Sequence, residues 1–312
     1  MKESLSEASQ TPIGTQIFLD HVGWFVSDMD TLSTTMERLG FKLTPFVPQY
    51  NANPIGGASI PTGTGNRCAM LKRGYLEFLT AIPNEETTLS KQLNTAVKRY
   101  QGLHLIALSV DDHKGAFTRL ETLGFKPIKP VNLRRPIELQ GGDKVEVAFT
   151  VLRVPPDKME EGRIQILRQD TPHLVWRKEL ISEENVNLAL GSVIIIVRDP
   201  KVVAKRFSKF CGKKAIGSSE YQTIDLDRGR LAFFTPEKYL QILPGVKIPS
   251  IPYIGTVGIQ CENMEFTETF LNQRGIAMTK ISKTVKYVRP ADAGGCAIAF
   301  YGHNIVWPPA AH

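Results

Sequence analysis

Apolar and polar residues follow one another along this chain in a repeated order that predicts a strand, one helix and then further strands. The segment IFLDHVGWFVSDMD (residues 17–30) predicts a strand and an Asp-containing turn. TLSTTMERLGF (31–41) then predicts an amphipathic helix that ends at a Gly. GLHLIALSVDD (102–112) and HKGAFTRLETLGF (113–125) repeat this order. In both copies an Asp is placed to cap the start of the helix and a Gly to end it.

A weaker version of the same pattern occupies the second half. LGSVIIIVRDP (190–200) and IGTVGIQCEN (254–263) predict two further first strands, each followed by a helical pattern. Runs of alternating β-branched and aromatic residues, bounded by Gly and Pro, follow the helices and predict three more strands per copy. The repeat unit is therefore βαβββ, and the chain holds four such modules.

Four such modules predict an α+β protein made of two paired-module domains, each with a curved mixed sheet around a cavity. A doubly wound fold is excluded because each helix is followed by three strands. The polar segment ISEENVN places the boundary near Ser182, which gives one domain over residues 17–181 and a second over residues 182–312. The polar residues 1–16 are predicted to be a flexible leader.

Composition and charge indicate where in the cell the protein is expected and what kind of ligand it is expected to bind. No apolar run approaches the roughly 20 residues of a membrane span, and residues 1–16 lack the apolar segment of a signal peptide. The four cysteines show no CxxC spacing, so we expect reduced thiols in a cytoplasmic protein. The net charge of +7 favours an anionic small molecule. Neither a nucleic-acid partner nor a membrane is predicted, because no recognition motif or basic stripe accompanies this charge.

The repeat itself selects candidate chemistry. Aligning the modules matches His21, His104, Ser192 and Thr256 on the first strands and Glu77, Gln165 and Ala232 on the last, with Ala297 or Ile298 in module four. Only modules one and two therefore carry side chains that bind a metal well. A carboxylate or imidazole within an apolar strand is costly unless it is paired, so these matched insertions suggest one shared partner. Two His and one carboxylate, with Gln165 as a weak fourth ligand, suit one divalent metal (Fe, Mn, Ni, Co or Zn).

Each of these residues also has a plainer explanation when it is taken alone. A His on a strand is commonly a hydrogen-bonded structural residue, and an ion pair with Arg67 or Arg73 would satisfy Glu77. The metal site is favoured because the symmetry of the repeat selected the positions before their identity was considered.

Three segments, LDHVGWFVSDMD, GTGNRCAMLKRGYLEFL and GLHLIALSV, resemble the glyoxalase-like branch of the vicinal-oxygen-chelate superfamily, which also includes bleomycin resistance proteins and extradiol dioxygenases. The resemblance covers modules one and two. It implies metal ligands on the first and last strands of paired modules, which correspond to His21, Glu77, His104 and Gln165. Glyoxalase I-like members have a proton-accepting Glu where Gln165 stands, and extradiol dioxygenases take their Glu from the later module rather than from the position of Glu77.

Further candidates lie around this set. The Gly-rich segment GGASIPTGTGNR (56–67) lacks the GK[ST] of a phosphate-binding loop and predicts a long loop at the cavity mouth. Asn66 and Arg67 at its end are candidates for binding an anionic substrate, and an ordinary surface or ion-pair role is equally consistent with them. Gln165 would orient the substrate, and His173 would serve as the catalytic base that Gln165 cannot be. The plainer alternative for His173 is packing beside Trp176.

The sequence therefore predicts a metal-dependent vicinal-oxygen-chelate enzyme acting on a small anionic oxygenated molecule. The metal would act as a Lewis acid, and the reaction would be an isomerisation, a lyase reaction or a ring-cleaving dioxygenation. The alternative is a non-catalytic protein of the same fold that binds and sequesters a small molecule. Modules three and four would be a degenerate pair that serves as a scaffold or forms a homodimer.

Overall fold

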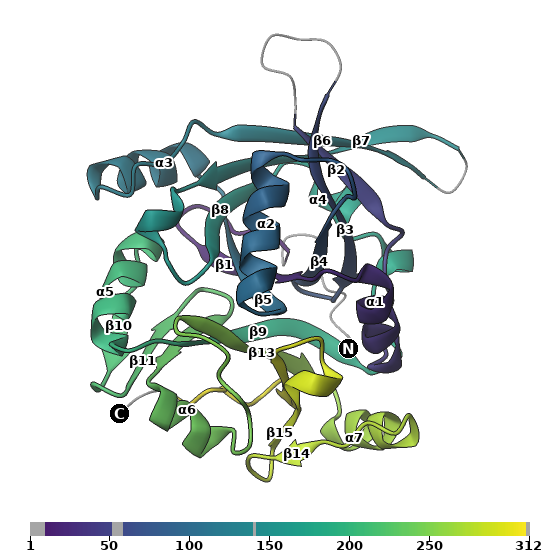
Figure 1. Cartoon of the computed structure of the whole chain (residues 1–312), viewed down its shortest axis with the longest axis vertical. Coiled ribbons are helices and arrows are strands. Elements are labelled where there is room, and N and C mark those ends of the chain that lie inside the picture. Colours follow the sequence, from purple (N-terminus) through teal and green to yellow (C-terminus); the bar gives the residue numbers. More distant parts are fainter. Residues whose placement is uncertain (1–9, 52–58, 140–141, 310–312) are drawn as a thin grey trace.

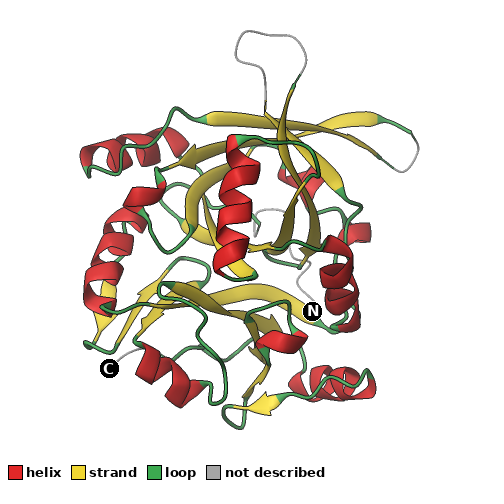
Figure 2. Cartoon of the chain, in the orientation of Figure 1, coloured by secondary structure: helices red, strands yellow, loops and turns green. Residues whose placement is uncertain are grey.

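The computed structural model describes residues 10–51, 59–139 and 142–309 of the chain. Its sixteen strands belong to one curved, mixed and unclosed sheet. Helices lie along its flanks, whereas the helix over Thr88–Arg99 (α2) stands in the centre of the view, in front of the strands of the first half (Figures 1 and 2). The predicted α+β class is therefore confirmed. Among the described residues, no helix is long and apolar enough to cross a membrane.

Four modules of the predicted order follow one another along the chain. Module one consists of β1 (Ile17–Phe25), α1 (Met29–Arg38), β2 (Val47–Asn51), β3 (Ile60–Met70) and β4 (Tyr75–Ala81). Module two consists of β5 (Gly102–Val110), α3 (His113–Thr122), β6 (Val131–Glu138), β7 (Lys144–Arg153) and β8 (Arg163–Gln169). Module three consists of β9 (Asn187–Ile196), α5 (Pro200–Cys211), β10 (Ala215–Gly217), β11 (Tyr221–Asp225) and β12 (Arg230–Phe234). Module four consists of β13 (Tyr253–Cys261), α7 (Met264–Gln273), β14 (Thr279–Lys280), β15 (Val285–Val288) and β16 (Ala297–Gly302).

Three connections that follow the last strand of a module also contain α-helices. They are α2 (Thr88–Arg99) between modules one and two, α4 (Pro172–Val175) after module two, and α6 (Pro236–Ile242) between modules three and four. Side chains cap α2 and α6 at Thr87 and Thr235, whose hydroxyl groups accept from backbone N–H groups of the first turn.

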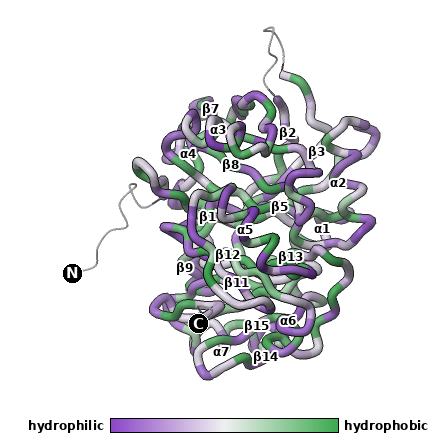
Figure 3. The backbone as a smooth tube through the Cα atoms, turned by 90° about the vertical axis from the view of Figure 1, so that its left-hand side faces the viewer, coloured by the Kyte–Doolittle hydropathy of each residue, from purple (hydrophilic) through white to green (hydrophobic). Residues whose placement is uncertain are grey.

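The modules are joined through their first strands. β1 pairs antiparallel with β5, which makes the first half an eight-stranded sheet in the order β2-β3-β4-β1-β5-β8-β7-β6. β9 and β13 join the second half in the same way. The ladder pair Ile254–Leu103 connects the two halves of the sheet, and the isolated bridges Phe18–Arg228 and Arg73–Ala189 connect them as well. From the side, the halves are stacked along the long axis of the molecule (Figure 3).

The two central strands of the first half each contain one extra residue. In the β1–β5 ladder the register shifts once on each strand, and the residues skipped are Asp20 and His104. Because the shifts are symmetric, Asp20 is the structural counterpart of His104, and the counterpart of His21 is Leu105. The sequence alignment of His21 with His104 is therefore wrong by one residue. A shift of one residue turns a strand side chain to the other face of the sheet.

In modules three and four the alignment predicted for the first strands agrees with the ladder, and one position of the last strands changes. The skipped residues of the β9–β13 ladder include Gly191 and Gly255, so Ser192 and Thr256 occupy the place of His21. The parallel ladders match Glu77 with Gln165, Ala232 and, in module four, Ala299 rather than Ala297 or Ile298.

A single hydrophobic core connects all four modules. It contains buried residues of the four first strands together with residues of α1, α3, α5 and α7, among them Trp24, Leu120, Phe207, Val257 and Leu271. The inner face of the second half is filled by aromatic side chains, which are Tyr221, Tyr239, Tyr253, Tyr287, Tyr301 and Trp307. Aromatic side chains therefore occupy the positions that correspond to the cavity-facing positions of the first half, and the scaffold or dimerisation role of modules three and four stays a prediction.

The predicted Gly-rich loop is largely a strand in the structure. Residues 60–67 of the predicted Gly-rich loop belong to β3, because pairing with β2 and β4 on both sides overrides the low strand propensity of Gly; residues 52–58 lie outside the described residues. The segment at Ser182 is buried and tied to module one, since its N–H donates to the Met70 carbonyl. Of the predicted leader, residues 1–9 lie outside the described range, and the Gly14 N–H donates to Asp111.

The shared core predicts that both halves unfold together. Of the three tryptophans, Trp24 donates to the Ala293 carbonyl of module four, so a Trp24→Phe/Trp307→Phe variant leaves Trp176, in the first half, as the fluorescence reporter. In this background Phe233→Ala, which removes a fully buried ring from the second half, should cost about 3–5 kcal/mol. The denaturant midpoints by fluorescence and by circular dichroism should fall by the same amount. An unchanged fluorescence midpoint would show that the halves unfold independently.

Candidate active site

The curved eight-stranded sheet of the first half forms a cup around a cavity of about 410 Å³, a size typical of small-molecule sites. Leu105 contributes to its floor, and Leu79, Leu133, Val151 and Leu167 to its apolar lining. Leu89 of α2 and Leu174 of α4 also line it. The polar lining residues that the sequence had singled out are His21, Asn66, Glu77 and Gln165.

His21 is held in one orientation by the residue before it. Its Nδ1 donates to Asp20 Oδ1 over 2.8 Å, and Gln169 Nε2 donates to the same carboxylate. Both Asp20 and His21 are buried. With Nδ1 bonded to Asp20, the ring directs its other nitrogen, Nε2, at the cavity. The ring also stacks on Tyr75, with centroids 4.3 Å apart.

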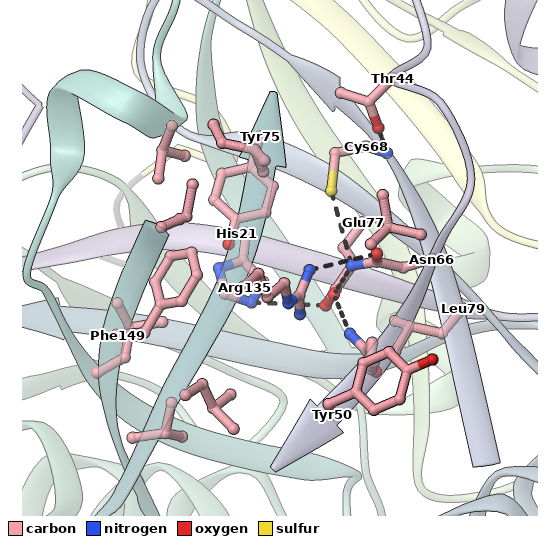
Figure 4. Close-up of a pocket in the computed structure, with 18 of the residues that line it drawn as sticks. His21, Thr44, Tyr50, Asn66, Cys68, Tyr75, Glu77, Leu79, Arg135 and Phe149 are labelled. Carbon is pink, nitrogen blue, oxygen red and sulfur yellow. Dashed lines mark hydrogen bonds and ion pairs between the residues drawn. The ribbon is translucent and has the colours of Figure 1, made fainter. Parts of the chain in front are cut away.

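Glu77 faces His21 from the neighbouring strand (Figure 4). Its Oε2 lies 3.7 Å from His21 Nε2. Its Oε1 accepts from Asn66 Nδ2 at 2.6 Å and from Gln49 Nε2 at 3.3 Å. Arg135 donates in turn to Asn66 Oδ1. One carboxylate oxygen is thus fixed by amides, and the other remains directed at His21.

Part of the predicted metal-ligand set comes together in this cavity. His21 Nε2 and Glu77 Oε2 are close enough to bind one ion at the usual ligand distances of roughly 2.0–2.2 Å. Gln165 Oε1 is buried and has no hydrogen-bond partner among the described residues. Gln165 lines the same cavity as His21 and Glu77, and the nitrogen and oxygen atoms of these side chains are of the types that bind divalent cations. Among the described residues, however, no group of three His, Cys, Asp or Glu side chains is placed to hold a metal ion.

His104 is not brought to this group. It does not line the cavity; as the extra residue of β5 it is directed toward the end of α2. Its Nε2 donates to the Tyr100 carbonyl at 2.8 Å, its Nδ1 lies 3.5 Å from Arg99 Nη2, and its ring stacks on Tyr100. Both ring nitrogens are engaged, so the structure gives the predicted ligand role of His104 no support.

Two other predicted residues also lie away from the cavity. Arg67 is next to Asn66 on β3 and therefore faces the opposite side, where it donates to the Thr44 carbonyl and to Ser33. His173 is exposed on α4 and does not line the cavity, so its predicted role as a base has no geometric support. Asn66, by contrast, lines the cavity and donates a hydrogen bond to Glu77.

Sequence reasoning missed six charged residues of the site. Asp20 orients His21, and the cavity is also lined by Arg135, Glu138, Arg153, Arg163 and Arg177. Arg163 could have been found from strand alternation, since it lies two residues before Gln165 and thus on the same face. Arg153 can be identified only from the register of the β7–β8 ladder, which pairs it with Gln165.

Cys68 and Tyr75 also line the cavity, but neither is ionised at neutral pH. Burial raises the pKa of the Cys68 thiol, and the negative charge of Glu77 raises it further. Burial likewise raises the pKa of Tyr75, with Asp20 and Glu77 adding to the effect. A thiolate nucleophile is therefore excluded here.

Comparison with known proteins shows the family of this chain. A family model described as Glyoxalase-like domain matches residues 19–211, which span modules one and two and the start of module three. The chain belongs to the glyoxalase-like domain family. No curated protein matches the sequence of this glyoxalase-like protein.

Solved structures share the fold of the whole chain. A hypothetical protein from Staphylococcus aureus superimposes with a TM-score of 0.63 at 12% identity, covering 92% of this chain and 99% of its own. A 4-hydroxymandelate synthase mutant from Streptomyces coelicolor gives 0.53 at 14% identity, covering 95% of each chain. A xylose isomerase-like TIM barrel/4-hydroxyphenylpyruvate dioxygenase fusion protein gives 0.58 at 11% identity, covering 95% of this chain and 51% of the fusion. These similarities show that the glyoxalase-like chain shares the fold of these three proteins over nearly its whole length.

The surroundings of His104 predict its titration. Burial, as the main cause, lowers the pKa of His104 to about 4, below its ordinary value of 6.5. Because the unfolded chain binds the proton first, this His contributes stability that is complete above about pH 6.5 and is lost as the pH falls toward 4. His104→Gln should therefore lose less stability over that interval. Nitrogen-detected NMR should show a proton on Nε2 and no titration near pH 6.5; a pKa near 6.5 would contradict this environment.

Proposed function

We propose that this glyoxalase-like protein is a metal-dependent enzyme acting on a small anionic molecule that carries an oxygen function. One divalent ion would be held by His21 Nε2, Glu77 Oε2 and Gln165 Oε1. The observation that supports this most is the 2.8 Å hydrogen bond from His21 Nδ1 to Asp20. Metal-binding histidines almost always donate their other ring N–H to such a partner, which fixes the tautomer.

The side chains of the cavity would prepare it for such an ion and its ligand. Bound there, the ion would supply a Lewis acid that polarises an oxygen of the ligand. Asp20 keeps the His21 Nε2 lone pair directed at the cavity, and Gln169 holds Asp20 in place. Asn66 and Gln49 hold Glu77 by its other oxygen, so that Oε2 stays available. The apolar walls exclude water, which strengthens every electrostatic interaction inside.

The proposal predicts stoichiometric metal binding that depends on named residues. Calorimetry on chelator-treated protein should detect one Mn²⁺ per chain. His21→Ala and Glu77→Gln should abolish this binding, because each removes one ligand atom. Asp20→Asn should weaken it by about 10–100-fold, because it removes only the group that orients His21. Gln165→Ala should weaken it less than either ligand change.

Two variants serve as matched controls. His104→Gln and His173→Ala each remove a His that does not line the cavity, so both should bind Mn²⁺ like the wild type. Loss of binding in His104→Gln with an unchanged circular dichroism spectrum would contradict the assignment. Wild-type protein that binds no divalent metal would also overturn it. The Asp20–His21 pair would then be a base in a metal-free site or part of a non-catalytic binding pocket.

A further inference from the structure

Two arginines face the cavity without an acidic partner. Arg153 on β7 and Arg163 on β8 line the wall that module two contributes. Within the described residues, neither guanidinium makes a hydrogen bond or an ion pair within 4.0 Å. Arg153 Nε is buried without a partner, and the contact of Arg163 is with the ring of Phe25, 4.9 Å from its Cζ. The nearest electrostatic counterpart of both is Glu77.

This pair of like charges is costly in the empty cavity. Burial, together with the charge of Arg153, lowers the pKa of Arg163 to about 10. Burial also lowers the pKa of Arg153. Both groups remain protonated at neutral pH, so the cavity keeps two neighbouring positive charges. Both side chains are partly buried, and a charge removed from water is normally compensated by an opposite one; a bound anion would supply it here at closer range than Glu77.

The symmetry of the fold shows that the two walls differ in charge. The equivalent positions are Glu77, Tyr75 and Cys68 in module one and Gln165, Arg163 and Arg153 in module two. At these matched positions module one thus gives Glu77, beside His21, and module two gives Arg153 and Arg163; Arg135 and Glu138 of β6 add one charge of each sign to the lining from module two. Leu105 and Ala107 on β5 separate them and are apolar. A ligand lying across this floor would meet opposite chemistry at its two ends.

We propose that Arg153 and Arg163 form a carboxylate-binding subsite, so that the ligand is a small organic acid with an apolar body and an oxygen function at its other end. This inference rests on the proposed function, because it is His21 and Glu77 that would receive that oxygen. Arginine suits the role, since its planar guanidinium donates two parallel hydrogen bonds to a carboxylate.

Calorimetry on chelator-treated protein tests the subsite without any metal. The probes are straight-chain carboxylates from butanoate to octanoate and the corresponding neutral amides. At least one acid should bind, and its amide should bind at least about tenfold more weakly, as expected for the loss of a charge-assisted hydrogen bond. Arg153→Met and Arg163→Met should each weaken acid binding by a similar factor. Arg168→Met is the control on the same strand, because Arg168 pairs with Asp170 instead, and it should bind the acid like the wild type.

Thermal unfolding separates a binding role from a structural one. Arg163→Met removes an uncompensated charge, so the ligand-free variant should melt at a higher temperature than the wild type. The acid should raise the melting temperature of the wild type but not that of the variant. If Arg163→Met does not fold, Arg163→Lys retains the charge without the fork and should bind the acid more weakly than the wild type. A less stable Arg163→Met, together with no acid that binds the wild type, would overturn the subsite.

The outcome is independent of the metal assignment. Arg163→Met should still bind Mn²⁺, since it retains His21, Glu77 and Gln165. Acid binding without Mn²⁺ binding would support the subsite and reject the metal site. Mn²⁺ binding without preference for acids over amides would reject the subsite and leave the metal site standing.

Discussion

One extra residue on each of two central strands determines which side chains reach the cavity. On β1 the extra residue is Asp20, which lies beside His21 and bonds to its ring. On β5 it is His104, whose ring is directed at the Tyr100 carbonyl instead of the cavity. Bulges of this kind re-aim side chains at functional sites. A nearly symmetric pair of modules thereby acquires one imidazole in the cavity rather than two.

The same asymmetry extends to charge and to the second half of the molecule. Module one supplies the Asp20, His21 and Glu77 side chains, whereas module two supplies Arg153 and Arg163. The second cup is filled by aromatic residues, and its core is continuous with that of the first. In the first half, polar residues occupy cavity-facing positions, where they reduce the apolar burial that would otherwise stabilise the sheet.

Much of this arrangement could be predicted from the sequence. The βαβββ repeat follows from hydrophobic periodicity, and strand alternation places Glu77 and Gln165 on one face. His104 could not be placed, because GLHLIAL aligns with LDHVGWF whether or not a bulge intervenes; the ladder alone shows the shift. Arg67 illustrates the opposite case, since its position next to Asn66 already puts it on the other face. The cavity role of Arg153 depends on pairing across strands, which propensity and period do not contain.

The most direct test of this account is an anomalous-scattering map of crystals grown with Mn²⁺. The account predicts one peak, bounded by His21 Nε2, Glu77 Oε2 and Gln165 Oε1, with His104 still bonded to the Tyr100 carbonyl. A peak coordinated by His104, or a fully occupied ion elsewhere with an empty His21–Glu77 pair, would contradict it.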